Sequence, residues 1–276
     1  RLSAQDLFGS NGLATLAADP LLCTLLNSVP IRDIEMERFL TMARRAMLDA
    51  ARGMTAADGE DGTALSFYSA LARQCFINEY VFSHTDDEIQ IASDLRDSLV
   101  AALDAKTQVP VLWPVAVAAY FPLCSLPLAA RLLDSQWPKE VAALLVQQVR
   151  EPAEELQIRI TIPRLTSIED EVSLLVQSQY EENPYPRWIK TAPADKAKNI
   201  VEYLCQKFPL ASFKRYDKSG DIDVLIAGCG TGQHSIDTAQ QFRGAQVLAV
   251  DLSINSLCYA KRKTRELGLT SIEYAQ

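Results

Sequence analysis

The sequence predicts an α-helical N-terminal region followed by an α/β domain with parallel strands. Apolar residues recur at helical spacing through most of residues 1–165. Two short apolar runs, 224–227 and 247–250, have the length and β-branched content of buried parallel strands, and a glycine turn and a helical stretch separate them. A third run, 271–276, alternates as a strand does. We therefore expect three parallel strands at the C-terminal end.

Length and composition are those of an ordinary globular chain of about two domains. The chain has 276 residues, of which 48% are hydrophobic and 22% charged. We expect a helical domain at 1–165, connecting helices at 166–222, and the N-terminal half of an α/β domain at 223–276. The net charge of −8 argues against a broad nucleic-acid interface, so no nucleic-acid partner is expected.

The cysteines and histidines are too scattered for a metal site or a disulfide framework. Six cysteines occur without a C-x-x-C pair, and the chain has only two histidines. This pattern is typical of reduced cysteines in a cytoplasmic protein, and we expect that location and no metal.

Apolar spacing and capping residues define the expected helices of the N-terminal region. Thr85 opens a capping box, T-D-D-E, which predicts a helix to about residue 105. Pro138 suits the first position of a helix that ends near Arg150. The uncharged run 107–130 is long enough for a bilayer, but its prolines break a spanning helix, so two short buried helices are expected. The remaining expected helices are 33–51, 64–82 and 167–180, the last capped by Ser167, while 158–162 fits strand or helix equally well.

The segment Tyr180–Trp188, YEENPYPRW, groups binding-type side chains. Two prolines separated by one residue favour an extended or turning backbone. An aromatic face attracts a cation, and Arg187 can hold a carboxylate through two hydrogen bonds. The alternative is a rigid linker whose Tyr185 and Trp188 pack on the next domain, and both readings stay open. A further amphipathic helix is expected within 190–209.

The most informative stretch is 223–253, a strand, glycine turn, helix, strand and acid in register. The first strand leads into G-C-G-T-G, and a helix is expected from about His234 to Phe242. Gly244 ends that helix as a C-terminal cap would. The second strand leads directly into Asp251.

Such a unit is suited to binding a nucleoside. Gly228, Gly230 and Gly232 let the backbone approach a ligand, and the helix start presents unpaired N–H groups to it. Asp251 is placed to accept both ribose hydroxyls. The spacing G-x-G-x-G, with Gln233 following, lacks the glycine of the dinucleotide fingerprint G-x-G-x-x-G and does not fit a phosphate P-loop.

These motifs resemble those of S-adenosylmethionine-dependent methyltransferases of the Rossmann-like type, with AGCGTGQ as the first motif and AVDLS as the second. Longer stretches resemble bacterial methyltransferases that often carry tetratricopeptide repeats in front: RQCFINEYVF (73–82), QYEENPYPRW (179–188), VLIAGCGTGQHS (224–235) and AVDLSINSLCYAKRKTRELGL (249–269). The resemblance implies a methyltransferase that uses S-adenosylmethionine.

The resemblance also implies roles for single residues. The glycine loop would line the methionine end of the cofactor, Asp251 would hold the ribose hydroxyls, and Leu252 would lie against the adenine. The cofactor-binding residues implied in this way are Gly228, Cys229, Gly230, Thr231, Gly232, Asp251 and Leu252. Residues 180–188 would lie at the mouth of the site. The candidates for substrate or lid contacts there are Tyr180, Asn183, Tyr185, Arg187 and Trp188. No catalytic residue is identified.

The chain also departs from the resemblance. The repeats are absent, and three strands are expected where the full fold has seven. The first strand would be left as an apolar edge. We therefore expect a fragment of a longer protein, holding an incomplete site and inactive on its own.

The methyl acceptor is not identified. The acidic charge favours a small molecule, a sugar or a protein over nucleic acid, and no membrane partner is expected. A protein partner for the helical domain is left open. Two alternatives remain: a non-catalytic interaction module that keeps the fold, and a nicotinamide-dependent oxidoreductase, which Gln233 disfavours.

Overall fold

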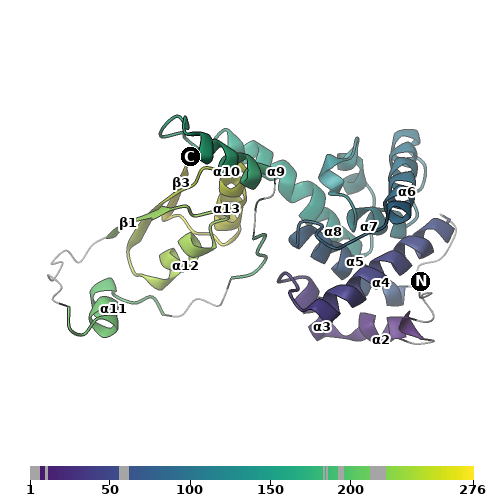
Figure 1. Ribbon diagram of the computed structural model, residues 1–276, viewed down its shortest axis with the longest axis horizontal. Coiled ribbons are helices and arrows are strands. Elements are labelled where there is room, and N and C mark those ends of the chain that lie inside the picture. Colours follow the sequence, from purple (N-terminus) through teal and green to yellow (C-terminus); the bar gives the residue numbers. More distant parts are fainter. Residues whose placement is uncertain are drawn as a thin grey trace. The chain divides into compact units, whose positions relative to one another are not determined.

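The computed structural model describes residues 7–9, 12–55, 62–182, 184, 186–191, 196–211 and 222–276. The chain divides into two compact units, Arg1–Ala153 and Glu154–Gln276, each with its own hydrophobic core. The first unit is helical and the second contains the sheet (Figure 1). The division lies within helix α9, Glu151–Arg159.

The first unit is built around one central helix. Its α-helices are α2 (Gly12–Ala18), α3 (Pro20–Leu26), α4 (Ile34–Gly53), α5 (Gly62–Ile77), α6 (Asp86–Ala105), α7 (Leu112–Ala118) and α8 (Lys139–Leu145). Two 3-10 segments, η1 (Leu123–Ser125) and η2 (Ala129–Asp134), and a π-helical turn, η3 (Val146–Arg150), complete it. Helix α5 contacts α2, α3, α4, α7 and α8, and it buries Phe67, Leu71 and Ile77 completely. A wide apolar face of this kind is typical of a core helix.

Only one of the two hydrogen bonds of the predicted capping box at Thr85 forms. The Thr85 hydroxyl accepts the Glu88 N–H, so α6 begins where predicted. The Glu88 carboxylate does not return to the cap. It accepts hydrogen bonds from the buried guanidinium of Arg44, at 3.1 Å, and from the Tyr120 hydroxyl, and it thereby ties α6 to α4 and to the turn after α7. A tertiary ion pair has replaced the local contact.

Three predictions for this unit differ from the structure. Helix α5 ends at Ile77, not at 82, because Glu79 and Tyr80 take left-handed backbone angles, with φ of 56° and 58°. The proline-rich run forms one α-helix, α7, and 3-10 segments instead of two α-helices. The helix that follows Pro138 does not end at Arg150, because η3 and α9 continue it to Arg159. Residues 158–162 are therefore the end of a helix and a turn, and no strand forms there.

The second unit holds a parallel sheet of three described strands. Its elements after α9 are α10 (Glu171–Glu182), α11 (Ile200–Lys207), β1 (Ile222–Ala227), α12 (Gln233–Gln241), β2 (Ala245–Val250), α13 (Ile254–Glu266) and β3 (Ile272–Ala275). The strand order is β1-β2-β3, and Ile226, Ala249 and Tyr274 lie in one row across it. Helix α10 begins after Asp170, whose carboxylate accepts the Ser173 N–H, and not at the predicted cap Ser167.

Helices α12 and α13 cover one face of this sheet. Ile236 of α12 and Leu257 of α13 are fully buried with the inward-facing strand residues (Figure 1). On the other face, Leu225 is 67% exposed and Leu248 is 38% exposed. A helical region followed by a Rossmann-like α/β unit with three parallel strands is the predicted fold class, and it is confirmed.

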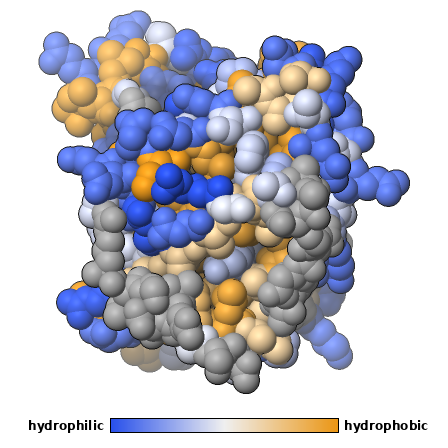
Figure 2. Space-filling view, turned by 90° about the vertical axis from the view of Figure 1, so that its right-hand side faces the viewer, coloured by the Kyte–Doolittle hydropathy of each residue, from blue (hydrophilic) through white to orange (hydrophobic). Residues whose placement is uncertain are grey.

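The surface of the helical unit is mixed in character. In Figure 2, hydrophobic residues form separate patches between hydrophilic ones, as is common on water-exposed surfaces. Within the described part of the chain, every helix is too short or too polar to cross a membrane.

Candidate cofactor site

The glycine loop lies at the carboxyl end of β1 and is tied to the end of β2. The N–H groups of Gly228 and Cys229 donate to the Val250 carbonyl, at 2.8 and 3.1 Å. All three loop glycines have positive φ: 70° at Gly228, 53° at Gly230 and 82° at Gly232. The loop therefore uses backbone angles that glycine adopts without the steric penalty of a Cβ.

The three glycines are needed for two different reasons. A Cβ on Gly232 would lie 2.5 Å from the Ala260 Cβ and 3.0 Å from the Tyr274 hydroxyl, so this glycine lets the loop pack closely on α13. A Cβ on Gly228 or Gly230 would meet no atom within 4 Å. Both positions line a cavity, so their missing side chains leave room for a ligand against the backbone.

Asp251 joins the end of β2 to the glycine loop. Its Oδ2 accepts the Gly230 N–H at 2.8 Å, and its Oδ1 accepts the Ser253 N–H at 2.9 Å. A carboxylate offers about four acceptor positions, so roughly two remain for a ligand. The acid is thus oriented by the backbone and still able to accept hydroxyl groups.

The other expected loop residues have distinct environments. Cys229 is buried, and burial, aided by the charge of Asp251, raises the pKa of its thiol to about 12. The thiol is therefore protonated and unreactive at neutral pH. Thr231 is 2% exposed, and Leu252 is half-buried beside the cavity.

The cavity beside the loop has a volume of about 790 Å³. Its lining residues from the loop and the end of β2 are Gly228, Cys229, Gly230, Thr231, Asp251 and Leu252. Residues Val176 and Tyr180 of α10, with Pro186, add a largely apolar wall. Gln233, His234 and Asp237, from the first turns of α12, add a polar wall. A ligand in this cavity meets backbone, apolar and polar surfaces together.

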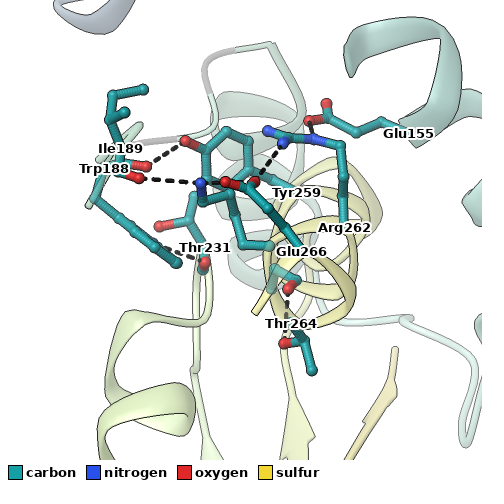
Figure 3. Close-up of polar contacts among 10 residues, drawn as sticks. Glu155, Trp188, Ile189, Thr231, Tyr259, Arg262, Thr264 and Glu266 are labelled. Atoms are coloured by element: carbon teal, nitrogen blue, oxygen red, sulfur yellow. Dashed lines mark hydrogen bonds and ion pairs between the residues drawn. The ribbon is translucent and has the colours of Figure 1, made fainter. Parts of the chain in front are cut away.

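The segment Pro186–Ile189, which we call the strap, fastens the glycine loop to α13. The Thr231 hydroxyl donates to the Pro186 carbonyl at 2.8 Å, and the Trp188 indole N–H donates to the Thr231 carbonyl at 3.0 Å. Figure 3 shows the strap carbonyls of Trp188 and Ile189 directed at α13, where the Tyr259 hydroxyl and the Lys263 ammonium donate to them. The loop is therefore held from outside the cavity as well as from within.

The structure brings together some of the predicted substrate or lid residues and separates others. Tyr180 lines the cavity. Trp188 is 5% exposed and lies under the Lys263 ammonium, 5.2 Å from the ring centre, where it acts in the strap. Arg187 is half-buried and does not line the cavity. Asn183 and Tyr185 lie outside the described residues.

Sequence reasoning identified Tyr180 but missed the side chains of Val176, Gln233, His234 and Asp237 in the walls of the cavity. Val176 was grouped with a helix that carries no motif, so no signal in the sequence marks it. His234 and Asp237 could have been found, because residues three apart on a helix share a face and this helix starts at the loop. Burial raises the pKa of Asp237 above its ordinary value, while the charge of His234 acts in the opposite direction. No group of three histidine, cysteine or acidic side chains among the described residues could hold a metal ion.

Comparison with known proteins assigns the C-terminal part of the chain. Residues 224–276 match the family described as methyltransferase domain. Among curated proteins, none matches the chain. A solved structure that shares 18% identity is the crystal structure of coclaurine N-methyltransferase bound to N-methylheliamine and SAH, with a TM-score of 0.26. The alignment covers 67% of this chain and 49% of that one, so the present chain spans about half the length of that protein.

The residues of the site fit the cofactor that such domains use. Two side-chain-free positions face the cavity, and one oriented carboxylate keeps acceptor positions for hydroxyl groups. These are the requirements for a nucleoside whose remaining part lies along a backbone. Residues 224–276 match the methyltransferase-domain family, and the cavity is a candidate site for S-adenosylmethionine.

Proposed function

We propose that this chain carries the cofactor site of an S-adenosylmethionine-dependent methyltransferase that acts on a small-molecule acceptor. One observation carries the proposal: Asp251, held by the Gly230 and Ser253 N–H groups, faces the same cavity as two open glycines. The match of residues 224–276 to a methyltransferase domain supports it. The tetratricopeptide-associated type and a cytoplasmic location belong to the same proposal and rest on the sequence motifs and the scattered cysteines.

In this proposal each part of the cavity has one task. Gly228 and Gly230 lie along the methionine end of the cofactor, the free acceptor positions of Asp251 take the ribose hydroxyls, and Leu252 contacts the adenine. The bound cofactor supplies an activated methyl group. The remaining task of the chain is to hold the nucleophile of the acceptor in line with that group, which is a positioning effect.

The size of the cavity favours a small acceptor. Ligand sites for small molecules are typically about 300–1,000 Å³, and this one has about 790 Å³ for cofactor and acceptor together. The net charge of −8 also disfavours a polyanionic acceptor such as nucleic acid.

Calorimetric titration of S-adenosylhomocysteine into the 276-residue chain tests the proposal, with NAD as the competing ligand. We expect binding of S-adenosylhomocysteine only. Asp251→Ala removes two charge-assisted hydrogen bonds to the ribose, each worth about 1.5–3 kcal/mol, so affinity should fall at least 100-fold.

Asp223→Ala is the matched control, because it removes an exposed acid at the opposite end of the same sheet. It should bind as the unaltered chain does. Preference for NAD would favour an oxidoreductase, and binding of neither ligand would favour an interaction module. Normal binding by Asp251→Ala would remove that residue from the site.

A further inference from the structure

Helix α10 has its apolar side exposed. Val172 is 67% exposed, Leu175 is 72%, Val176 is 37% and Tyr180 is 43%. At 3.6 residues per turn, positions 172, 175, 176 and 180 lie on one side of the helix. We call these four residues the apolar ridge. An amphipathic surface helix normally buries such a side, so its exposure requires an explanation.

A different side of α10, which is polar, is the one that contacts the rest of the unit. Ser173, Gln177 and Glu181 are half-buried there, and α10 contacts α13. The attachment is made by hydrogen bonds to the end of α10: the Ser253 hydroxyl donates to the Tyr180 carbonyl, and the Asn255 amide donates to the Glu181 carbonyl. The orientation of the helix is thus set by polar contacts, and they turn the ridge away from the core.

The ridge is continuous with the cofactor cavity. Val176 and Tyr180 line the cavity, whereas Val172 and Leu175 lie outside it. With a rise of 1.5 Å per residue, Val172 lies about 12 Å along the helix from Tyr180. The apolar surface therefore starts inside the cavity and extends beyond the part that the glycine loop and Asp251 enclose.

The area of the ridge suits a small molecule better than a protein. Four large side chains of this exposure present roughly 400 Å², about half of the ~800 Å² that each partner buries in a stable protein interface. The largest apolar patch on a typical monomer is about 300–600 Å² and is often functional, and a ligand-binding groove is one of its uses.

We propose that the apolar ridge of α10 is the wall against which a small, largely apolar methyl acceptor binds, with its nucleophile directed at the glycine loop. This inference rests on the proposed function, because it assigns to the acceptor the part of the surface that the cofactor leaves uncovered. It also limits the acceptor class: a compound with an apolar body of one or two rings, or a short chain, fits this wall, and a sugar or a polyanion does not.

The experiment uses prodan, a neutral apolar dye with two fused rings, titrated by fluorescence into the full chain saturated with S-adenosylhomocysteine. Leu175→Gln and Val172→Gln remove apolar surface outside the cofactor cavity. Leu174→Gln is the matched control: Leu174 is a neighbouring leucine, 45% exposed, about half a turn round the helix from Val176. Each variant is also tested for S-adenosylhomocysteine affinity, thermal stability and molar mass.

We expect Leu175→Gln and Val172→Gln to weaken dye binding at least fivefold, while Leu174→Gln leaves it unchanged and all three bind S-adenosylhomocysteine normally. Equal effects of all three, or none, would overturn the assignment of the ridge. So would a weaker affinity for S-adenosylhomocysteine in Leu175→Gln, which would make the ridge part of the cofactor pocket. An unaltered chain that is a dimer, and that Leu175→Gln dissociates, would show that a second copy covers the ridge. Failure of the unaltered chain to bind S-adenosylhomocysteine would contradict the proposed function instead, and the dye titration, then made without that ligand, would still report on the ridge.

Discussion

Replacing Gly232 or Gly230 by alanine should affect two different properties, the stability of the fold in the first case and cofactor binding in the second. Gly232→Ala places a Cβ 2.5 Å from the Ala260 Cβ and 3.1 Å from its Cα, where the contact is with backbone and cannot move freely. Gly230→Ala places a Cβ in open space at the cavity. We therefore expect the first change to reduce stability and the second to reduce cofactor binding.

The magnitudes follow from strain and overpacking. A left-handed backbone costs a residue with a Cβ about 1–2 kcal/mol at either position, and overpacking a close contact costs about 1–3 kcal/mol more at Gly232. Gly232→Ala should thus lose about 2–5 kcal/mol, and the melting temperature of the second unit should fall by roughly 10–20 °C. Gly230→Ala should lose only the about 1–2 kcal/mol of stability that comes from backbone strain. Its methyl group, however, displaces the ligand from the backbone, so affinity for S-adenosylhomocysteine should fall at least tenfold.

Differential scanning calorimetry measures the first effect and titration calorimetry the second. If Gly232→Ala melts at the same temperature as the unaltered chain, Ala260 is not the neighbour that requires a glycine at position 232. If Gly230→Ala binds S-adenosylhomocysteine normally, the open side of the loop is not the ligand side.

Three further outcomes are expected. Trp188→Phe keeps an aromatic ring but loses the indole hydrogen bond to the Thr231 carbonyl of the loop. Titration calorimetry should therefore show an affinity for S-adenosylhomocysteine that is about fivefold lower, as expected for the loss of about 1 kcal/mol. Trp137→Phe loses a similar hydrogen bond inside the helical unit and should leave this affinity unchanged. With a pKa of about 12, only about one Cys229 thiol in ten thousand is ionised at pH 8. A thiol reagent, followed by peptide mass analysis, should therefore label the exposed Cys205 before Cys229. Equal labelling rates at the two cysteines would contradict the burial of Cys229. Arg44→Met strands a buried carboxylate and should destabilise the helical unit by about 3–5 kcal/mol in urea unfolding, without changing cofactor affinity.

Local signals predicted the elements whose ends depend on local chemistry. Thr85 caps α6 as expected, and Asp33 caps α4 in the same way, since a side chain three residues before an N–H group can reach it in any protein. Predictions failed where tertiary contacts decide. The left-handed turn at Glu79 and Tyr80 ends α5 early, and the sequence has no glycine or proline at these positions that would predict it. The run 158–162, which fits strand or helix equally well in the sequence, is the end of α9 and a turn, and its Ile158 and Ile162 pack into the second core.

The residues of the candidate site also fall into two groups, those that local sequence identifies and those whose role depends on tertiary contacts. The loop glycines and Asp251 could be identified because they follow one another along a strand-turn-helix unit whose geometry is general. The role of Trp188 in the strap could not be identified, since it depends on a hydrogen bond to Thr231, forty-three positions away. The exposed ridge was also beyond reach, because periodicity shows that α10 has an apolar side and does not show which way that side faces.

The three tryptophans of the chain divide unevenly between the units: Trp113 and Trp137 are in the helical unit, and Trp188 is in the strap. The Trp188 indole is hydrogen-bonded to the glycine loop and lies 5.2 Å from the Lys263 ammonium. The fluorescence emission wavelength of Trp188 therefore depends on the electric field of the Lys263 ammonium and on the hydrogen bond to Thr231, and both change when the loop moves. A chain in which Trp113 and Trp137 are replaced by Phe would carry its own optical probe, and stopped-flow fluorescence could then follow the arrival and departure of the cofactor without a label.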